Sequence, residues 1–267
     1  MNILDRLFST KINKKELKRN LLVEWALSAK EYIIEHKNIA YGILIGIVVI
    51  IIAVPLYISS YNKKVDEASK FFETGLYFYR NAFYNKDLTP DERLNNLKES
   101  IKRWEFVVRE FSSTPVAKDA LFYEAGAYYE LGDYNNAIKK YEELYNKDDD
   151  YYFIDIVLID KAKCYEQLNN LQGALASYQK VVEDYPDSAG APYAQYNIAK
   201  IYELSNKLKE ALQGYQKVVA NYKYSIWAQQ SRKRMLFLQT FLVRKPINKK
   251  VEKNNNKFEQ LPQLPPK

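Results

Sequence analysis

Apolar positions recur with helical spacing in three segments that align without a gap at intervals of 37 residues. The segments are 123–144, 160–181 and 197–218. The recurring positions are Ala125/Ala162/Ala199, Tyr128/Tyr165/Tyr202, Tyr134/Leu171/Leu208, Ala137/Ala174/Ala211, Tyr141/Tyr178/Tyr215 and Leu144/Val181/Val218. This pattern predicts an all-α fold that repeats one structural unit.

Each unit is predicted to be a helical hairpin. A small residue such as Ala125 lets the first helix approach its partner closely, and Tyr128 lies on the same helix face. Ala137, Tyr141 and Leu144 are spaced i, i+4, i+7, so they form the apolar stripe of the second helix. Because one hairpin cannot cover its own stripe, neighbouring hairpins must stack into a solenoid.

A further, divergent hairpin is predicted at residues 61–115, with an inserted loop around residues 85–92. The segment SIKRWEFV at 100–107 aligns with the second helix of the repeats. The first helix of this hairpin is predicted at residues 66–84, where Gly75 and Phe78 take the small and the aromatic position. With the three clear repeats, the solenoid therefore contains about four hairpins.

The three clear repeats occupy residues 116–225. Residues 226–242 are predicted to form a helix that caps the array. After it the helical pattern fails, and residues 243–267 are rich in Lys, Asn and Pro. Such a composition cannot bury enough apolar surface to fold, so this tail is predicted to be disordered.

A different pattern precedes the repeats. Residues 39–58 form 20 consecutive positions without a charged side chain. A helix rises about 1.5 Å per residue, so this run spans the roughly 30 Å of a bilayer core. We therefore expect a transmembrane helix at 39–60, with 1–38 as an N-terminal arm. The arm is too long and the apolar run too extended for a cleaved secretory signal.

The basic residues next to the span are equally numerous on both sides, but the patch KINKKELKR at 11–19 favours a cytoplasmic arm. The repeats are then expected on the periplasmic side. Gly42 and Gly46 form a GxxxG pair, a candidate transmembrane contact through which the chain would form a homo-oligomer. The alternative is that both are ordinary glycines of a membrane helix.

Composition excludes several functions. The net charge is +7, but residues 61–241 carry 25 basic and 26 acidic side chains, so the repeat domain has no nucleic-acid footprint. With one Cys and one His, the chain can form neither an internal disulfide nor a Cys/His zinc site, and a His-assisted nucleophile is not available. We therefore predict no enzyme, and no catalytic, cofactor-binding or metal-binding residues.

Arrays of helical hairpins have a concave groove, lined mainly by the first helix of each hairpin. Aromatic and charged side chains on these helices suit an extended or helical polypeptide, although each of them would also fit an ordinary solvated helix face. The candidate protein-binding residues are Phe122, Tyr129, Lys163, Glu166, Tyr196, Lys200 and Glu203.

The order small-x-x-Tyr…Ala-x-x-x-Tyr…Pro resembles the tetratricopeptide repeat. Pro186 follows Ala174 by 12 residues, at the place of the family's terminal proline, whereas the other two repeats have Asp149 and Lys223 there. The period of 37 also departs from the family's value of about 34. The resemblance implies an α-solenoid that binds proteins.

The order of arm, span and repeats, together with LVEWALSAKEYIIEHKN at 22–38, is similar to the ancillary subunit of the bacterial Sec translocon. That resemblance implies a place in the bacterial cytoplasmic membrane, with translocon subunits and periplasmic chaperones as partners. The segment 185–202 is also similar to repeats of the Tol-Pal cell-division coordinator and of the Bam-complex lipoprotein. An envelope-assembly protein and a self-associating structural membrane protein therefore stay open as alternatives.

Overall fold

The computed structural model describes residues 23–240, except 26, 29, 31, 33 and 149. Every regular element in this part of the chain is a helix, which confirms the predicted all-α class. The helices are α3 (Lys37–Tyr84), α4 (Pro90–Glu110), α5 (Pro115–Glu130), α6 (Tyr134–Lys147), α7 (Ile154–Gln167), α8 (Leu171–Asp184), α9 (Ala191–Leu204) and α10 (Leu208–Asn221), followed by helical residues at 226–240.

The chain divides into two units, residues 1–64 and 65–267. The predicted tail, most of the predicted arm and the last two residues of the predicted capping helix lie outside the described residues. The apolar run at 39–58 lies within α3, and its most apolar stretch has no buried residue. A Cβ atom added at Gly42 or Gly46 would meet nothing within 4 Å. This part of α3 therefore has the length and composition of a membrane span.

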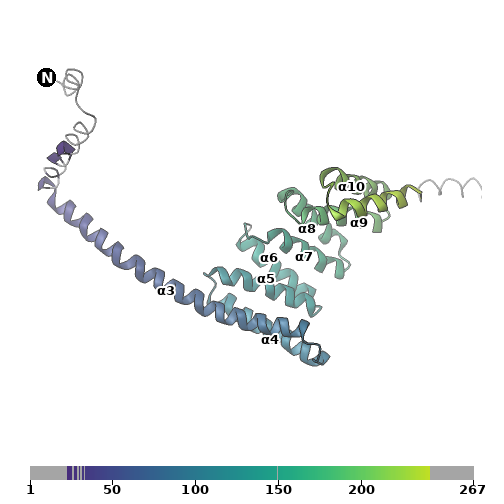
Figure 1. Ribbon diagram of the computed structural model, residues 1–267, viewed down its shortest axis with the longest axis horizontal. Coiled ribbons are helices and arrows are strands. Elements are labelled where there is room, and N and C mark those ends of the chain that lie inside the picture. Colours follow the sequence, from purple (N-terminus) through teal and green to yellow (C-terminus); the bar gives the residue numbers. More distant parts are fainter. Residues whose placement is uncertain are drawn as a thin grey trace, which may run out of the picture. The chain divides into compact units, whose positions relative to one another are not determined.

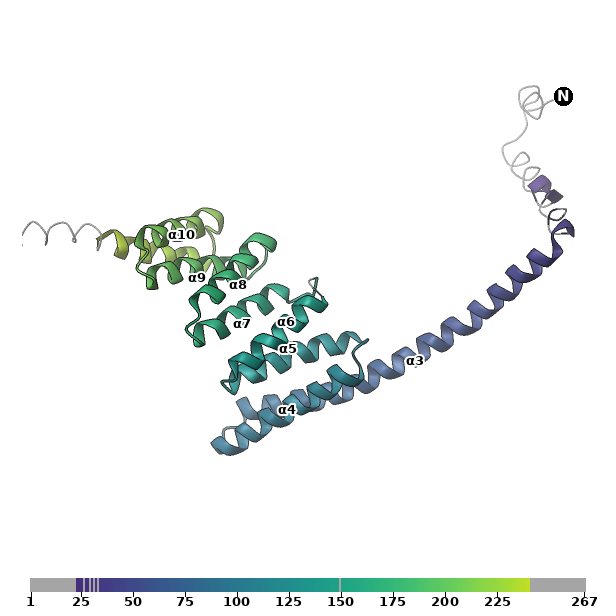
Figure 2. The same cartoon turned by 180° about the vertical axis from the view of Figure 1, so that it is seen from behind.

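In the second unit, successive helices stack as hairpins (Figures 1 and 2). The helix pairs α5/α6, α7/α8 and α9/α10 pack within each hairpin, and α6/α7 and α8/α9 pack between hairpins. The part of α3 from Ala68 onward packs on α4 and makes the first hairpin. The predicted solenoid of four hairpins, followed by a C-terminal helix, is therefore the observed architecture.

The recurring aromatic residue of the second helix forms the core of every hairpin. Tyr141, Tyr178 and Tyr215 are at most 2% exposed, and Trp104 takes the same place in the first hairpin with no exposure. Trp104 fits because its partner is Gly75, where a Cβ would lie only 2.6 Å from the indole Nε1. The sequence register of 37 residues is therefore the register of the hydrophobic core.

The recurring tyrosine of the first helix makes a hydrogen bond between hairpins. The hydroxyl of Tyr128 donates to Glu105 Oε1 at 3.0 Å, and the hydroxyl of Tyr165 donates to Glu142 Oε1 at 3.5 Å. Glu105 and Glu142 lie 37 residues apart on successive second helices. The same side-chain bond therefore joins two successive pairs of hairpins.

The turn inside each hairpin also repeats. Gly132, Asn169 and Asn206 have φ angles of 76°, 54° and 57°, and each ends a first helix. This left-handed conformation suits Gly and Asn, and it lets the next backbone N–H reach back to the helix carbonyls. The turn thus reverses the chain in the same way in three hairpins.

The loop of the first hairpin is shorter than the predicted insertion and occupies residues 85–89. The loop ends at Thr89 because this residue caps the start of α4. The Thr89 hydroxyl accepts a hydrogen bond from the backbone N–H of Glu92, and the Glu92 carboxylate accepts one of 2.8 Å from the backbone N–H of Thr89. Pro90, at the first helical position, suits a helix start as well.

A charged pair lies in the core between α5 and α6. The Glu124 side chain has no solvent exposure, and its Oε1 is 2.8 Å from Lys140 Nζ. Burial raises the pKa of Glu124 to about 7, although Lys140 opposes the shift. The folded protein thus holds the Glu124 proton more tightly than the unfolded chain does.

The pKa of Glu124 is higher in the folded protein than in the unfolded chain. The contribution of Glu124 to the free energy of unfolding is therefore complete below the pKa of the unfolded chain, and it is lost as the pH rises through about 7. The loss is of the order of 3 kcal/mol. We expect the thermal midpoint to fall between pH 5 and pH 8, and to fall less in the Glu124→Gln variant. The exposed Glu183→Gln variant is the control. Equal pH dependence in wild type and Glu124→Gln would contradict this account.

Candidate functional site

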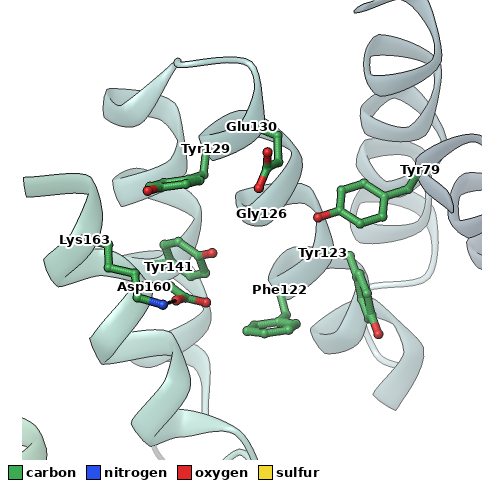
Figure 3. Close-up of a pocket in the computed structure, with 9 residues that line it drawn as sticks. All are labelled: Tyr79, Phe122, Tyr123, Gly126, Tyr129, Glu130, Tyr141, Asp160 and Lys163. Atoms are coloured by element: carbon green, nitrogen blue, oxygen red, sulfur yellow. Dashed lines mark hydrogen bonds and ion pairs between the residues drawn. The ribbon is translucent and has the colours of Figure 1, made fainter. Parts of the chain in front are cut away.

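A cavity of about 440 Å³ opens among three successive first helices, α3, α5 and α7 (Figure 3). Its lining consists mainly of aromatic side chains with a few charged ones. The residues are Tyr79 from α3, Phe122, Tyr123, Gly126, Tyr129 and Glu130 from α5, Tyr141 from α6, and Asp160 and Lys163 from α7. The cavity thus lies on the helices that were predicted to line the groove.

Gly126 explains why the cavity occurs at this hairpin. In the register of 37 residues, position 126 corresponds to Lys163 and Lys200, so the next two repeats carry a long side chain there. A Cβ at Gly126 would lie 3.9 Å from the hydroxyl of Tyr79 and 4.0 Å from that of Tyr141. The missing side chain therefore leaves open the space between two tyrosine hydroxyls.

Ring contacts fix the aromatic lining. Phe122 contacts Tyr123 and Tyr141, with ring centroids 5.6 and 6.4 Å apart, and Tyr79 contacts Tyr123 at 6.3 Å. Burial raises the pKa of Tyr79 to about 12, and burial also raises the pKa of Tyr129. Both phenols stay neutral at physiological pH, so they present hydroxyl groups beside apolar ring faces.

Three charged side chains line the cavity. Lys163 Nζ and Asp160 Oδ1 form an ion pair of 2.8 Å on one helix face. Glu130 has neither a hydrogen bond nor an ion pair with any described side chain, and desolvation raises its pKa. The cavity therefore combines a satisfied ion pair with one carboxylate that has no cation. In the described part of the chain, no cluster of acidic, His or Cys side chains could hold a metal ion.

The structure brings three of the seven candidate groove residues together. Phe122, Tyr129 and Lys163 all line the cavity. Glu166 is half-buried on α7 and Lys200 is exposed on α9, and neither lies in this cavity.

The other two candidates contact the helical segment at 226–240. Tyr196 packs on Trp227 with ring centroids 5.1 Å apart. Glu203 accepts a hydrogen bond of 2.8 Å from the Tyr215 hydroxyl and pairs with Arg234. Tyr196 and Glu203 therefore hold the C-terminal helix on the array.

Sequence reasoning missed six lining residues, which are Tyr79, Tyr123, Gly126, Glu130, Tyr141 and Asp160. Tyr79 belongs to the divergent hairpin, whose shifted spacing hides its place in the register. Gly126 was detectable, because it interrupts a position that is Lys in the next two repeats. A missing side chain at a groove position is thus the signal that would have located the cavity.

Two solved structures illustrate the overall similarity. A tetratricopeptide repeat protein from Parabacteroides merdae is 14% identical with a TM-score of 0.48, over 68% of this chain and 61% of its own length. MamA from Desulfovibrio magneticus is 17% identical with a TM-score of 0.49, over 73% of this chain and 95% of its own. The sequence has no significant match among curated proteins.

Two family models described as tetratricopeptide repeat match the sequence. One matches residues 92–152, and the other matches residues 157–188 and 193–223. The matched ranges contain the stacked helices α4 to α10, apart from the first two or three residues of α4, α7 and α9. These residues are therefore tetratricopeptide repeats, and they stack into an α-solenoid.

Proposed function

We propose that the protein is a membrane-anchored scaffold whose concave groove binds a polypeptide partner on the extracytoplasmic side. Tetratricopeptide repeats are protein-interaction scaffolds in general, so the class of function follows from the repeats themselves. The observation that carries the proposal is the aromatic cavity among α3, α5 and α7.

The lining suits a polypeptide. Rigid aromatic side chains provide large contact areas at a small entropy cost, and they are enriched at the centres of protein interfaces. The tyrosine hydroxyls and the Asp160–Lys163 pair add polar groups that fix the orientation of a bound chain. A volume of about 440 Å³ accommodates side chains of a partner rather than a folded domain.

Anchoring is supported by the exposed apolar run at 39–58 within α3. Leaving the Ile, Val and Leu side chains of this run in water rather than burying them would cost roughly 20–40 kcal/mol, whereas a bilayer removes that cost. The basic patch at 11–19 favours a cytoplasmic N-terminus, which puts the repeats outside the cytoplasm.

The cellular setting that we propose is the Sec translocon of the bacterial cytoplasmic membrane, with periplasmic chaperones and secreted chains as partners. Its support is the order of arm, span and repeats and the similarity of residues 22–38 to the translocon's ancillary subunit. Self-association is the second candidate. It is favoured by the open surface at Gly42 and Gly46, where a second helix would meet no side chain.

The proposed membrane anchor and its orientation, with the N-terminus in the cytoplasm, predict the activity of reporter fusions. Alkaline phosphatase fused after Lys64 or after Lys267 should be active, because it folds only outside the cytoplasm. Substituting Arg at both Val49 and Ile50 should abolish this activity, since each charge at the span centre costs about 3 kcal/mol. The matched control is Ala at the same two positions. An inactive fusion after Lys267 in the unsubstituted chain would contradict the proposed side.

The groove predicts where partners contact the chain. A benzophenone amino acid in place of Tyr129, which lines the cavity, should give cross-links to other proteins in living cells. The same amino acid in place of Glu143, exposed on the second helix α6, should give few. Translocon subunits among the Tyr129 adducts would support the proposed setting, and adducts only with the chain itself would support self-association. The same adducts at both positions would refute a groove-specific partner.

A further inference from the structure

The Glu130 carboxylate is the unbalanced charge of the cavity. Glu130 is an exposed residue, neighbouring groups desolvate its carboxylate only in part, and no described side chain gives it a hydrogen bond or an ion pair. A partly desolvated carboxylate is stabilised by an opposite charge. A ligand with a cationic group would supply that charge.

Lys163 does not balance Glu130. Its ammonium forms an ion pair with Asp160 at 2.8 Å and lies 5.6 Å from the centre of the Tyr193 ring. Glu130, Asp160 and Lys163 are the three charged residues of the lining, so the lining sums to one negative charge. An acidic ligand would therefore meet an uncompensated carboxylate.

The aromatic rings favour one kind of cation. Tyr79, Phe122, Tyr123 and Tyr129 line the cavity, and the ring quadrupole attracts a cation that lies over such ring faces. A guanidinium stacks on aromatic faces and binds a carboxylate through two parallel hydrogen bonds, and it is less strongly hydrated than an ammonium. An arginine fits this combination better than a lysine.

The open space lies where these groups converge. In Figure 3 the Glu130 carboxylate and the hydroxyls of Tyr79 and Tyr141 lie around the Gly126 backbone. No side chain at position 126 fills this space, and the equivalent positions in the next repeats carry the cationic residues Lys163 and Lys200. A cationic side chain of a ligand would thus enter the space that the absent side chain at position 126 leaves open.

We infer that the cavity binds an arginine side chain of the partner polypeptide, with the guanidinium between the aromatic rings and the Glu130 carboxylate. The inference rests on the proposed function, since it requires that the groove bind a polypeptide. It names the chemistry of that partner: an extended or helical segment with an arginine at the position that enters the cavity.

The test is selection from a random 12-residue peptide library displayed on phage, with the full chain in lipid nanodiscs as the target and empty nanodiscs subtracted. The selected peptides should share arginine at one aligned position. Gly126→Leu fills the cavity and should remove this preference, whereas Ala176→Leu, which puts the same side chain at an exposed site on α8, should keep it. Circular dichroism of each variant reports that the helices are intact.

A second measurement tests how much the positive charge of the arginine contributes to binding. A selected peptide, labelled with fluorescein, should bind about tenfold more tightly than its citrulline analogue, which has the same shape without the charge. The difference should largely vanish in Glu130→Gln and persist in Glu183→Gln, a matched change on α8.

The outcomes separate this inference from the proposed function. Recovery of no peptide above empty nanodiscs would contradict polypeptide binding altogether. Peptides without a preferred arginine, or arginine peptides that bind Gly126→Leu as tightly as wild type, would overturn only the inference. If arginine peptides bind only after the Lys and Arg residues of 243–267 are changed to Gln, the cavity holds the chain's own basic tail, which also overturns it.

Discussion

The repeat domain depends on one constraint: a hairpin cannot bury the apolar stripe of its second helix without a neighbour. Tyr141, Tyr178 and Tyr215 are almost fully removed from solvent, and the alanines at 137, 174 and 211 have no exposure. Small residues allow the helices to approach, and the large rings then fill the space between them. Stacking of hairpins is thus a condition for each hairpin to be folded at all.

Stacking also explains where function can be located. The core positions of the second helix, such as Ala137 and Tyr141 with their equivalents, keep the same residue in every clear repeat, whereas positions on the groove side such as 126 differ. Position 126 is Gly in one repeat and Lys in the next two, so the same backbone presents an open cavity at one hairpin and cationic side chains at the others. Tyr196 and Glu203, at the far end, instead bind the C-terminal helix. Variation within a fixed register therefore produces the site and the cap.

The sequence allowed the fold to be predicted because core positions have a strict spacing. The register of Ala137, Ala174 and Ala211 is visible as a period of 37 and reappears as the buried stripe. Contacts between polar groups were less predictable, since spacing does not show which carboxylate a hydroxyl will reach. The bonds from Tyr128 to Glu105 and from Tyr165 to Glu142 are examples. The cavity was only partly predictable, because it depends on Tyr79 from a hairpin of different length.

Hydrogen exchange measured by mass spectrometry on the full chain, with Val181→Ala compared to wild type, tests the interdependence of the hairpins most directly. Val181 is fully buried on α8, where it belongs to the core shared with α7 and α9. If hairpins support one another, amides in α7, α9 and α10 exchange faster in the variant, as do those in α8. Faster exchange confined to α8 would show that each hairpin folds alone, and would contradict the account.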